Sequence, residues 1–407
     1  MHDKYNHFQL RRWFSVLLIA AFCICGHSWR VAGSESTDLP DGKVDNDLIK
    51  AVNSGKPTIA RYLLAIGANP NMEITEGWTV LMEAAEKGNK TMFSSLLSRG
   101  ANPQARGYDG FTTLMAAARG GNEYIYKEVF LAAGYESVVS ASGYSLLMAA
   151  AAGGNENIFD KVRRRGINIR AVDNDGYSVL MAAAEGGNEE IFKFVLGFDK
   201  SIHPVDNMGR NLAYYGALGG NLKIFQFVIE NGADIQARSK IGSTVLLAAV
   251  KGRNVAIVRM CLEAEIDRDA GNDEGSTPLM WAMDSYNRYL ASVLLEAGAE
   301  INARGNTSYT VLHDQAKFDD YDSVYFLLKA GADPNIYDDE GRTVLMLAAR
   351  TGNYRIVRRM LKYGADPSLE DHDGLKAKDY AASAGKNKIV IMLENEENKI
   401  DEKGIIK

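Results

Sequence analysis

The chain has 407 residues, 46% of them hydrophobic and 24% charged, and its 46 basic and 52 acidic residues give a formal net charge of −6. This balance argues against a protein that binds nucleic acid, because such a protein needs a clustered basic face. The six histidines are scattered, and none has a cysteine or carboxylate at the spacing of a metal site.

The N-terminus has the pattern of an export signal. Arg11 and Arg12 precede an apolar run over residues 13–26. As a helix this run would span about 21 Å, which is short for a hydrocarbon core of about 30 Å but suits a signal peptide. Cleavage between Ser28 and Gly33 would place the protein in the periplasm or outside the cell. An uncleaved segment, the alternative, would anchor it in the inner membrane.

A glycine recurs at one fixed interval along most of the remaining chain. The step is 33 residues without insertion or deletion, and Ser308 interrupts the series once. A strict period in this range indicates a solenoid, in which one supersecondary unit is stacked many times. The turn glycines are Gly77, Gly110, Gly143, Gly176, Gly209, Gly242, Gly275, Gly341 and Gly374.

The unit is clearest in residues 340–366. A turn glycine is followed by a hydroxyl residue, an apolar helix with paired alanines, a Gly-Asn break, an amphipathic helix and a Gly-Ala-Asp stop. This pattern resembles the ankyrin repeat, whose signature is Gly-x-Thr-Pro-Leu-His-x-Ala, then Gly-His, an apolar helix and Gly-Ala-Asp. The resemblance covers residues 43–394 and implies an all-α repeat solenoid of about eleven units, both caps included.

The repeated positions have physical roles. Glycine takes the left-handed turn conformation cheaply, and the hydroxyl two residues later is a good cap for the first helix. The asparagine after the break is expected to cap the second helix. The expected caps are Thr79, Thr112, Ser145, Ser178, Thr244, Thr277, Thr310 and Thr343 for first helices, and Asn89, Asn122, Asn155, Asn188, Asn221 and Asn353 for second helices.

One side-chain column departs from the family pattern, and a lone cysteine takes a core position. The family's histidine stands only at His313, and methionine usually replaces it, which we interpret as core filling because thioethers pack irregular gaps well. Export would remove Cys23 and Cys25 with the signal, so Cys261 could form no intrachain disulfide. Cys261 takes the core slot of Leu96, which predicts a buried thiol. The methionine column is Met82, Met115, Met148, Met181, Met280 and Met346.

The ends have the pattern of caps. The first unit lacks a turn glycine, and around Gly374 lysine and aspartate replace apolar residues, as a terminal unit needs a polar outer face. The units around Gly209 and Ser308 depart from the consensus, either by drift or for a specific contact. We assign residues 1–33 to a signal or anchor, 34–42 to a linker, 43–394 to the solenoid and 395–407 to a polar tail.

No catalytic motif is present, since the chain has no Walker loop, Gly-x-Ser-x-Gly or His-Glu-x-x-His. We therefore expect a non-enzymatic monomer without cofactor or metal, which meets a membrane only through an uncleaved N-terminal segment. The resemblance implies a scaffold that binds a protein partner on hairpin tips and on the concave inner-helix face. The alternatives are a glycan or cell-wall binder, a membrane-anchored adaptor and a secreted effector.

The residue after each turn glycine is expected at a hairpin tip, and four successive tips carry aromatic rings. Aromatic residues and arginine are enriched in interface hot spots, so we predict that the partner docks on the first half of the array. The alternative is that each ring packs on its neighbouring turn and stiffens the row. The predicted site comprises Trp78, Phe111, Tyr144 and Tyr177, with Arg210, Tyr309 and Arg342 at later tips and Glu76, Asp109 and Asp175 on a polar rim.

Overall fold

The computed structural model describes residues 43–404 apart from residues 76, 135–138, 199–203 and 307, with side chains as far as Asn398. The predicted signal and linker therefore lie outside the described residues. The contacts divide the chain into two compact units, and each is described by itself. Unit 1 ends at Ala237 and unit 2 begins at Arg238.

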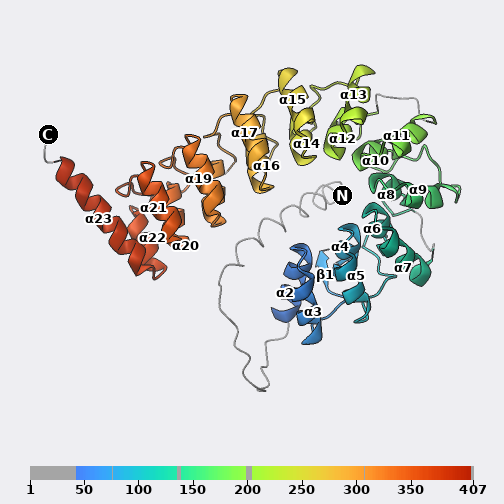
Figure 1. Ribbon diagram of the computed structural model, residues 1–407, viewed down its shortest axis with the longest axis horizontal. Coiled ribbons are helices and arrows are strands. Elements are labelled where there is room, and N and C mark those ends of the chain that lie inside the picture. Colours follow the sequence, from blue (N-terminus) through green and yellow to red (C-terminus); the bar gives the residue numbers. More distant parts are fainter. Residues whose placement is uncertain (1–42, 76, 135–138, 199–203, 307, 405–407) are drawn as a thin grey trace. The chain divides into compact units, whose positions relative to one another are not determined.

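Unit 1 consists of helix pairs that follow the 33-residue period (Figure 1). The first helix of each pair packs on the first helices of the neighbouring pairs, and the second helices form an outer layer. The elements are α2 (Lys43–Asn53), α3 (Pro57–Ala65), β1 (Glu73–Thr75), β2 (Trp78–Thr79), α4 (Val80–Glu86), α5 (Lys90–Leu97), α6 (Thr113–Arg119), α7 (Glu123–Ala133), α8 (Leu146–Ala152), α9 (Glu156–Arg163), α10 (Val179–Gly186), α11 (Glu189–Leu196), α12 (Leu212–Gly219) and α13 (Leu222–Glu230).

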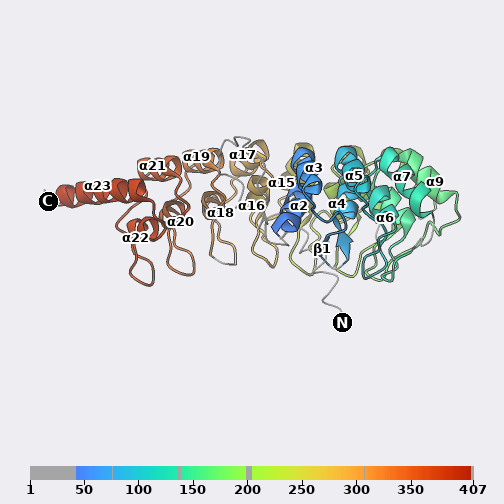
Figure 2. The ribbon, with the colours of Figure 1, turned by 90° about the horizontal axis from the view of Figure 1, so that it is seen from below.

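Unit 2 repeats the same layers. In Figure 2 its outer helices form the upper row, and its inner helices form the lower row from which the turns project. Its elements are α14 (Val245–Lys251), α15 (Val255–Glu263), α16 (Pro278–Asp284), α17 (Arg288–Glu296), α18 (Val311–Lys317), α19 (Tyr321–Lys329), α20 (Val344–Thr351), α21 (Tyr354–Lys362), α22 (Ala377–Ser383) and α23 (Asn387–Gly404). The predicted all-α repeat solenoid is confirmed.

The predicted caps explain where most helices begin. Thr112 Oγ1 accepts a hydrogen bond from the Met115 amide at 3.2 Å, and Asn122 Oδ1 accepts from the Ile125 amide at 3.3 Å. Asn122 also donates to the carbonyl of Gly88 at 3.0 Å, so one side chain starts a helix and ties it to the preceding repeat. The same pair of roles recurs at Asn155, Asn188 and Asn221.

Each turn folds into a short antiparallel arm. Strands β1 and β2 pair in the first arm, and seven of the later arms keep a single bridge, such as that of Arg106 with Thr112. The irregular unit keeps the geometry, because Ser308 takes the left-handed conformation (φ 55°) that Gly77 takes at φ 78°. We call these segments, from the bridge residue to the helix cap, the hairpin arms.

The inner helices of unit 1 pack closely at a repeated glycine. At Gly120 an added Cβ would lie 2.1 Å from the Ala85 carbonyl oxygen, so only glycine fits there. Gly153, Gly186 and Gly219 show the same crowding against the helix before them. In unit 2 the first equivalent position is Gly252, and the next is Ser285.

Buried columns form the core between the layers. The methionine column is at most 6% exposed, which confirms its role as core filling. Cys261 is fully buried, as predicted, and burial raises the pKa of its thiol to about 12. At the C-terminus α23 continues through residues 395–404, where we expected a polar tail, because Leu393 and Ile389 fix the start of this helix in the core.

Candidate partner-binding surface

The four aromatic residues of the predicted stripe are buried. Trp78, Phe111, Tyr144 and Tyr177 are 2%, 8%, 6% and 7% exposed. The prediction that these rings form an exposed stripe is therefore wrong, and the alternative, in which each ring packs on its neighbour, describes the structure. The glycan-binding hypothesis loses its support as well, because these rings were its stacking plates.

The rings are buried because they stack on one another along the arms. The centroid of Phe111 lies 5.4 Å from that of Trp78 and 5.5 Å from that of Tyr144, and the Tyr144 and Tyr177 centroids are 6.1 Å apart. Five residues after each of the last three rings the inner helix carries a fully buried alanine, which leaves room for the ring. These alanines are Ala116, Ala149 and Ala182.

In the next repeat the aromatic ring stands on the inner helix and not on the arm. Arg210 stands after the turn glycine, and Tyr215 replaces the alanine. The Tyr215 ring lies 5.1 Å from the Tyr177 ring and continues the stack. Its hydroxyl donates to Asp206 Oδ2 at 2.7 Å, and Arg210 Nε pairs with the same oxygen at 2.6 Å. We call Trp78, Phe111, Tyr144, Tyr177 and Tyr215 the ring column.

Charged side chains cover part of the ring column. Arg119 Nη2 lies 2.6 Å from Glu185 Oε1, and Arg119 Nε lies 3.3 Å from Glu86 Oε1. Arg119 on α6 reaches Glu185 on α10 past α8, which has only Ala152 at this position. Burial alone would lower the pKa of Arg119, but Glu185 and the hydroxyl of Tyr144 raise it above its usual value. These charges are therefore already neutralised within the fold.

The other described residues of the predicted site make polar contacts within their own arm or with a neighbouring arm. In unit 2, Arg342 Nη2 donates to the Tyr309 hydroxyl at 2.8 Å, and Arg342 Nε pairs with Asp338 Oδ2 at 2.8 Å. In unit 1, the backbone carbonyls of Asp109 and Asp175 accept amides of the next arm, at 2.6 and 2.7 Å. Glu76 lies outside the described residues.

Sequence reasoning missed a row of exposed valines on the arms of unit 1. Val139, Val172 and Val205 are 45%, 56% and 56% exposed, and each occupies the bridge position of its arm. They are 33 residues apart, so the period contained the signal, but our prediction considered only the residue after each turn glycine. We call these three residues the valine row.

Hydrogen bonds between neighbouring arms fix the spacing of the valine row. The Asn174 amide donates to the Ser142 carbonyl at 2.8 Å, and the Asn207 amide donates to the Asp175 carbonyl at 2.7 Å. The Asn207 side chain adds a bond to the Asn174 carbonyl at 2.9 Å. Together with the ring column, these bonds hold three exposed apolar side chains at fixed intervals.

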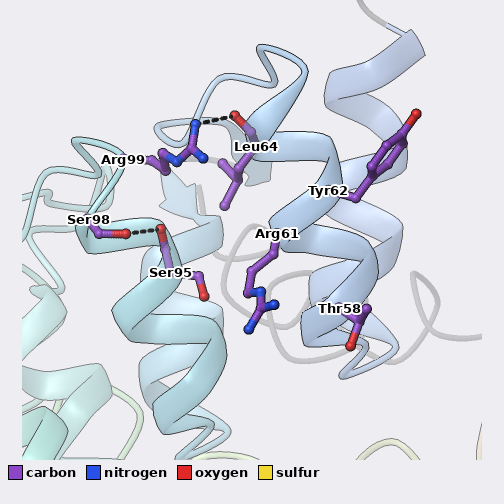
Figure 3. Close-up of a pocket in the computed structure, with 7 residues that line it drawn as sticks. All are labelled: Thr58, Arg61, Tyr62, Leu64, Ser95, Ser98 and Arg99. Carbon is purple, nitrogen blue, oxygen red and sulfur yellow. Dashed lines mark hydrogen bonds between the residues drawn. The ribbon is translucent and has the colours of Figure 1, made fainter. Parts of the chain in front are cut away.

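The outer layer of unit 1 contains grooves between adjacent second helices. One of about 460 Å³ lies between α3 and α5, where Arg61 projects towards Ser95 (Figure 3). Another of about 520 Å³ lies between α11 and α13 and is lined by apolar residues such as Phe192 and Phe227. The lining of the first groove includes one pair at the 33-residue period, Tyr62 and Ser95.

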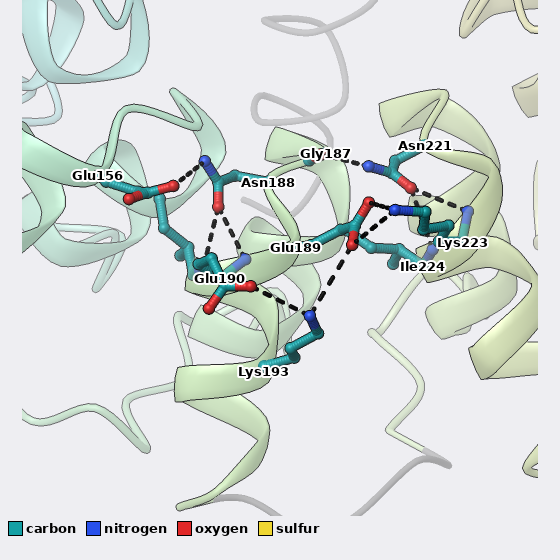
Figure 4. A network of polar contacts seen from close by, with 10 residues as sticks. Glu156, Gly187, Asn188, Glu189, Glu190, Lys193, Asn221, Lys223 and Ile224 are labelled. Carbon is teal, nitrogen blue, oxygen red and sulfur yellow. Dashed lines mark hydrogen bonds and ion pairs between the residues drawn. The ribbon is translucent and has the colours of Figure 1, made fainter.

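Polar contacts on this layer join neighbouring repeats (Figure 4). Lys223 Nζ lies 3.2 Å from Glu189 Oε1 across the gap between α11 and α13, and Lys193 Nζ lies 3.1 Å from Glu190 Oε1. Hydrogen bonds from Lys223 and Asn221 lower the pKa of Glu189. The cations on this part of the outer layer thus have carboxylate partners.

The repeats of the chain match a known protein family. A family model described as "Ankyrin repeats (3 copies)" matches residues 48–140, 146–239, 236–305 and 312–403. The chain belongs to the ankyrin repeat family. No curated protein matches the chain. Ankyrin repeats generally mediate protein–protein interactions and are typically not enzymes.

Within residues 43–404, apart from the gaps named above, no helix is both long and apolar enough to cross a membrane. Over the same residues no three histidine, cysteine or acidic side chains come together as a metal-binding group.

Proposed function

We propose that this ankyrin repeat protein is a non-enzymatic scaffold, and that it binds a protein partner along the hairpin arms of unit 1, with the valine row at the centre of the contact. The observation that carries the proposal is the exposure of Val139, Val172 and Val205 at the same position of three successive arms. Apolar side chains inside a polar rim are typical of the centre of a protein interface.

The rigid support beneath the valine row strengthens this proposal. The ring column and the bonds between arms order these backbones before any partner arrives. Binding then costs less conformational entropy than it would with mobile loops. The rings act as support for the contact surface, and the valines make the contact.

For the compartment we propose the periplasm or the cell exterior, with an inner-membrane anchor as the alternative. This part of the proposal rests on Arg11, Arg12 and the apolar run over residues 13–26. We further propose that the scaffold is a monomer and needs no cofactor.

The experiment is capture of the partner by the immobilised protein from extracts of the native cells. We expect Val139→Ser, Val172→Ser and Val205→Ser together to abolish retention of a protein that the wild type retains. Each exposed substitution should change the free energy of unfolding by no more than about 0.5 kcal/mol, so the melting curve serves as a check on the fold.

The matched control is Ile59→Ser with Tyr62→Ser, which removes apolar side chains that are 46% and 63% exposed on α3. This variant should retain the same protein as the wild type. Equal loss in the control variant, or full retention by the triple valine variant, would show that the valine row is not the binding surface.

A further inference from the structure

Helix α21 carries four cations on its outward side. Arg355, Arg358 and Lys362 are exposed, and Arg359 is half-buried. They stand at positions i, i+3, i+4 and i+7, which form one stripe along a helix, about 10 Å long. The opposite side of the helix packs into the core through Ile356, Val357 and Met360.

These cations have no carboxylate partner among the described residues. No ion pair involves any of the four, whereas Lys193 and Lys223 on the outer helices of unit 1 pair with glutamates. A stripe of four unneutralised positive charges stands out in a chain whose net charge is −6. The repulsion between these charges would be relieved by an anion from outside the fold.

Tyrosine rings on α19 hold two of the guanidinium groups in place. The Cζ of Arg355 lies 4.1 Å from the Tyr321 ring centroid, and that of Arg359 lies 5.6 Å from it and 4.4 Å from the Tyr325 centroid. Arg359 Nε donates to the Tyr321 hydroxyl at 3.2 Å, and hydrogen bonding from Arg359 lowers the pKa of Tyr321. Both guanidinium groups are thus ordered before a ligand binds.

The excess positive charge is one helix wide. The neighbouring outer helix α19 exposes Asp322 and Lys329. Among its described side chains, α23 exposes Lys388 and Glu394 and half-buries Glu396 and Glu397, so neither flank continues the positive stripe. An anionic membrane or a nucleic-acid duplex would meet the flanking carboxylates as well. A narrow acidic peptide fits within the stripe, and planar guanidinium groups match carboxylates in bidentate geometry.

We propose that the outward face of α21, with Tyr321 and Tyr325 of α19, binds an Asp/Glu-rich segment of a partner protein. This site shares no residue with the valine row, and it stands or falls independently of the function proposed for the arms. Binding at this site is selective for acidic sequences, and its affinity falls as the salt concentration rises, because salt screens exposed charges.

The test measures the fluorescence anisotropy of a labelled glutamate-rich peptide with the full-length protein over a range of salt concentrations. Arg355→Glu with Arg359→Glu should weaken binding at least about tenfold, because charge-assisted hydrogen bonds are lost and repulsion replaces them. Tyr321→Phe, which removes the hydroxyl that Arg359 contacts, should weaken binding by a smaller factor.

Two further variants make the result interpretable. Arg358→Glu with Lys362→Glu reverses the two cations that stack on no ring, and it should weaken binding similarly if the first variant fails to fold. Lys193→Glu with Lys223→Glu reverses two exposed cations on α11 and α13, and it should leave the affinity within about twofold of the wild type.

Four outcomes would overturn the proposal. The first is that the peptide does not bind, or binds with an affinity that salt and the α21 variants do not change. The second is that phosphatidylglycerol vesicles bind through α21 and the peptide does not. The third is that inorganic phosphate displaces the peptide at equal charge concentration. The fourth is that the α21 variants abolish self-association of the chain, which would make a second copy the occupant.

Discussion

At the scale of single residues, two carboxylates of unit 2 hold protons more tightly than usual. Burial raises the pKa of Asp284 to about 7, and the charge of Asp314 adds to this effect. Burial likewise raises the pKa of Asp314 to about 6, against the opposing charge of Lys317. Gln315 Nε2 donates to Asp284 Oδ1 at 3.3 Å, and this hydrogen bond favours the ionised form without offsetting the effect of burial.

The stability of unit 2 should therefore fall as the pH rises towards 8. Between about pH 4 and pH 7 the folded protein binds more protons at Asp284 than the unfolded chain, so unfolding becomes easier as the pH increases through this window. Asp284→Asn should remove part of this dependence, with a gain in Tm at pH 8 that exceeds the gain at pH 5. Differential scanning calorimetry at both values measures the effect.

Asp273→Asn is the control, because Asp273 is exposed on a hairpin arm. It removes the same charge and should leave the pH profile of Tm unchanged. If Asp284→Asn shifts Tm equally at pH 5 and pH 8, the carboxyl is not protonated in the fold and the interpretation of its burial is wrong.

Some residue roles could be read from the sequence because they depend on a single repeat. The cap at Thr112 and the left-handed turn at Gly77 need only their own backbone, and both are present. The burial of Tyr144 depends instead on rings in two neighbouring arms and on Ala149 beneath it. No pattern within one repeat distinguishes such a ring from an exposed one.

At the scale of the element, two side chains of each repeat occupy one space, the residue after the turn glycine on the arm and the residue five positions later on the inner helix. A ring on the arm accompanies alanine on the helix in three repeats, and Tyr215 on the helix accompanies Arg210 on the arm. The C-terminal repeat of unit 2 shows the same exchange, where Tyr380 on α22 donates to Asp371 at 2.6 Å and Leu375 stands on the arm. In these repeats one aromatic ring fills the place, whichever element supplies it, whereas the repeats of Gly242 and Gly341 have no ring at either position.

This exchange predicts a compensating pair of substitutions. Ala182→Tyr alone should destabilise the protein by about 1–3 kcal/mol, because the new ring competes with Tyr177 for the same space. Adding Tyr177→Arg should recover much of the loss, since the arginine would reach Asp173 as Arg210 reaches Asp206. Urea unfolding of the wild type, both single variants and the double variant gives the coupling energy.

One outcome of this double-mutant cycle would contradict the prediction. Additive losses within about 0.5 kcal/mol would mean that the two positions do not share a space. A matched control is Ala182→Tyr with Tyr144→Arg, in which the arginine stands one repeat away from the new ring and should not rescue it.

Element boundaries followed from the sequence where capping residues mark them, as Asn188 marks the start of α11. The polar composition of residues 395–407 predicts a frayed tail. The helix α23 nevertheless continues to Gly404. Its first part is anchored in the core by Leu393, so the helix extends beyond this residue without an apolar face of its own. The valine row was overlooked because valine at an arm position has no capping or packing motif of its own.

At the scale of the whole molecule, the 33-residue period predicted the family and the layered helices, since each repeat buries its faces on its neighbours. The period does not determine which side chains remain exposed. In unit 1 the arms expose Tyr108 and the valine row, and in unit 2 four cations without a carboxylate partner among the described residues line up on α21. Each surface therefore favours a different kind of contact, apolar in one unit and electrostatic in the other.

The central claim is that the valine row touches the partner while the ring column beneath supports it. The most direct measurement places a photo-crosslinking amino acid at position 172 of the full-length protein in the native cell, and at position 289 as a control. Tyr289 is 64% exposed on α17, so both probes are accessible. The account predicts one discrete crosslinked product from position 172 and none of the same mass from position 289. A product from position 289 alone, or the same product from both positions, would contradict it.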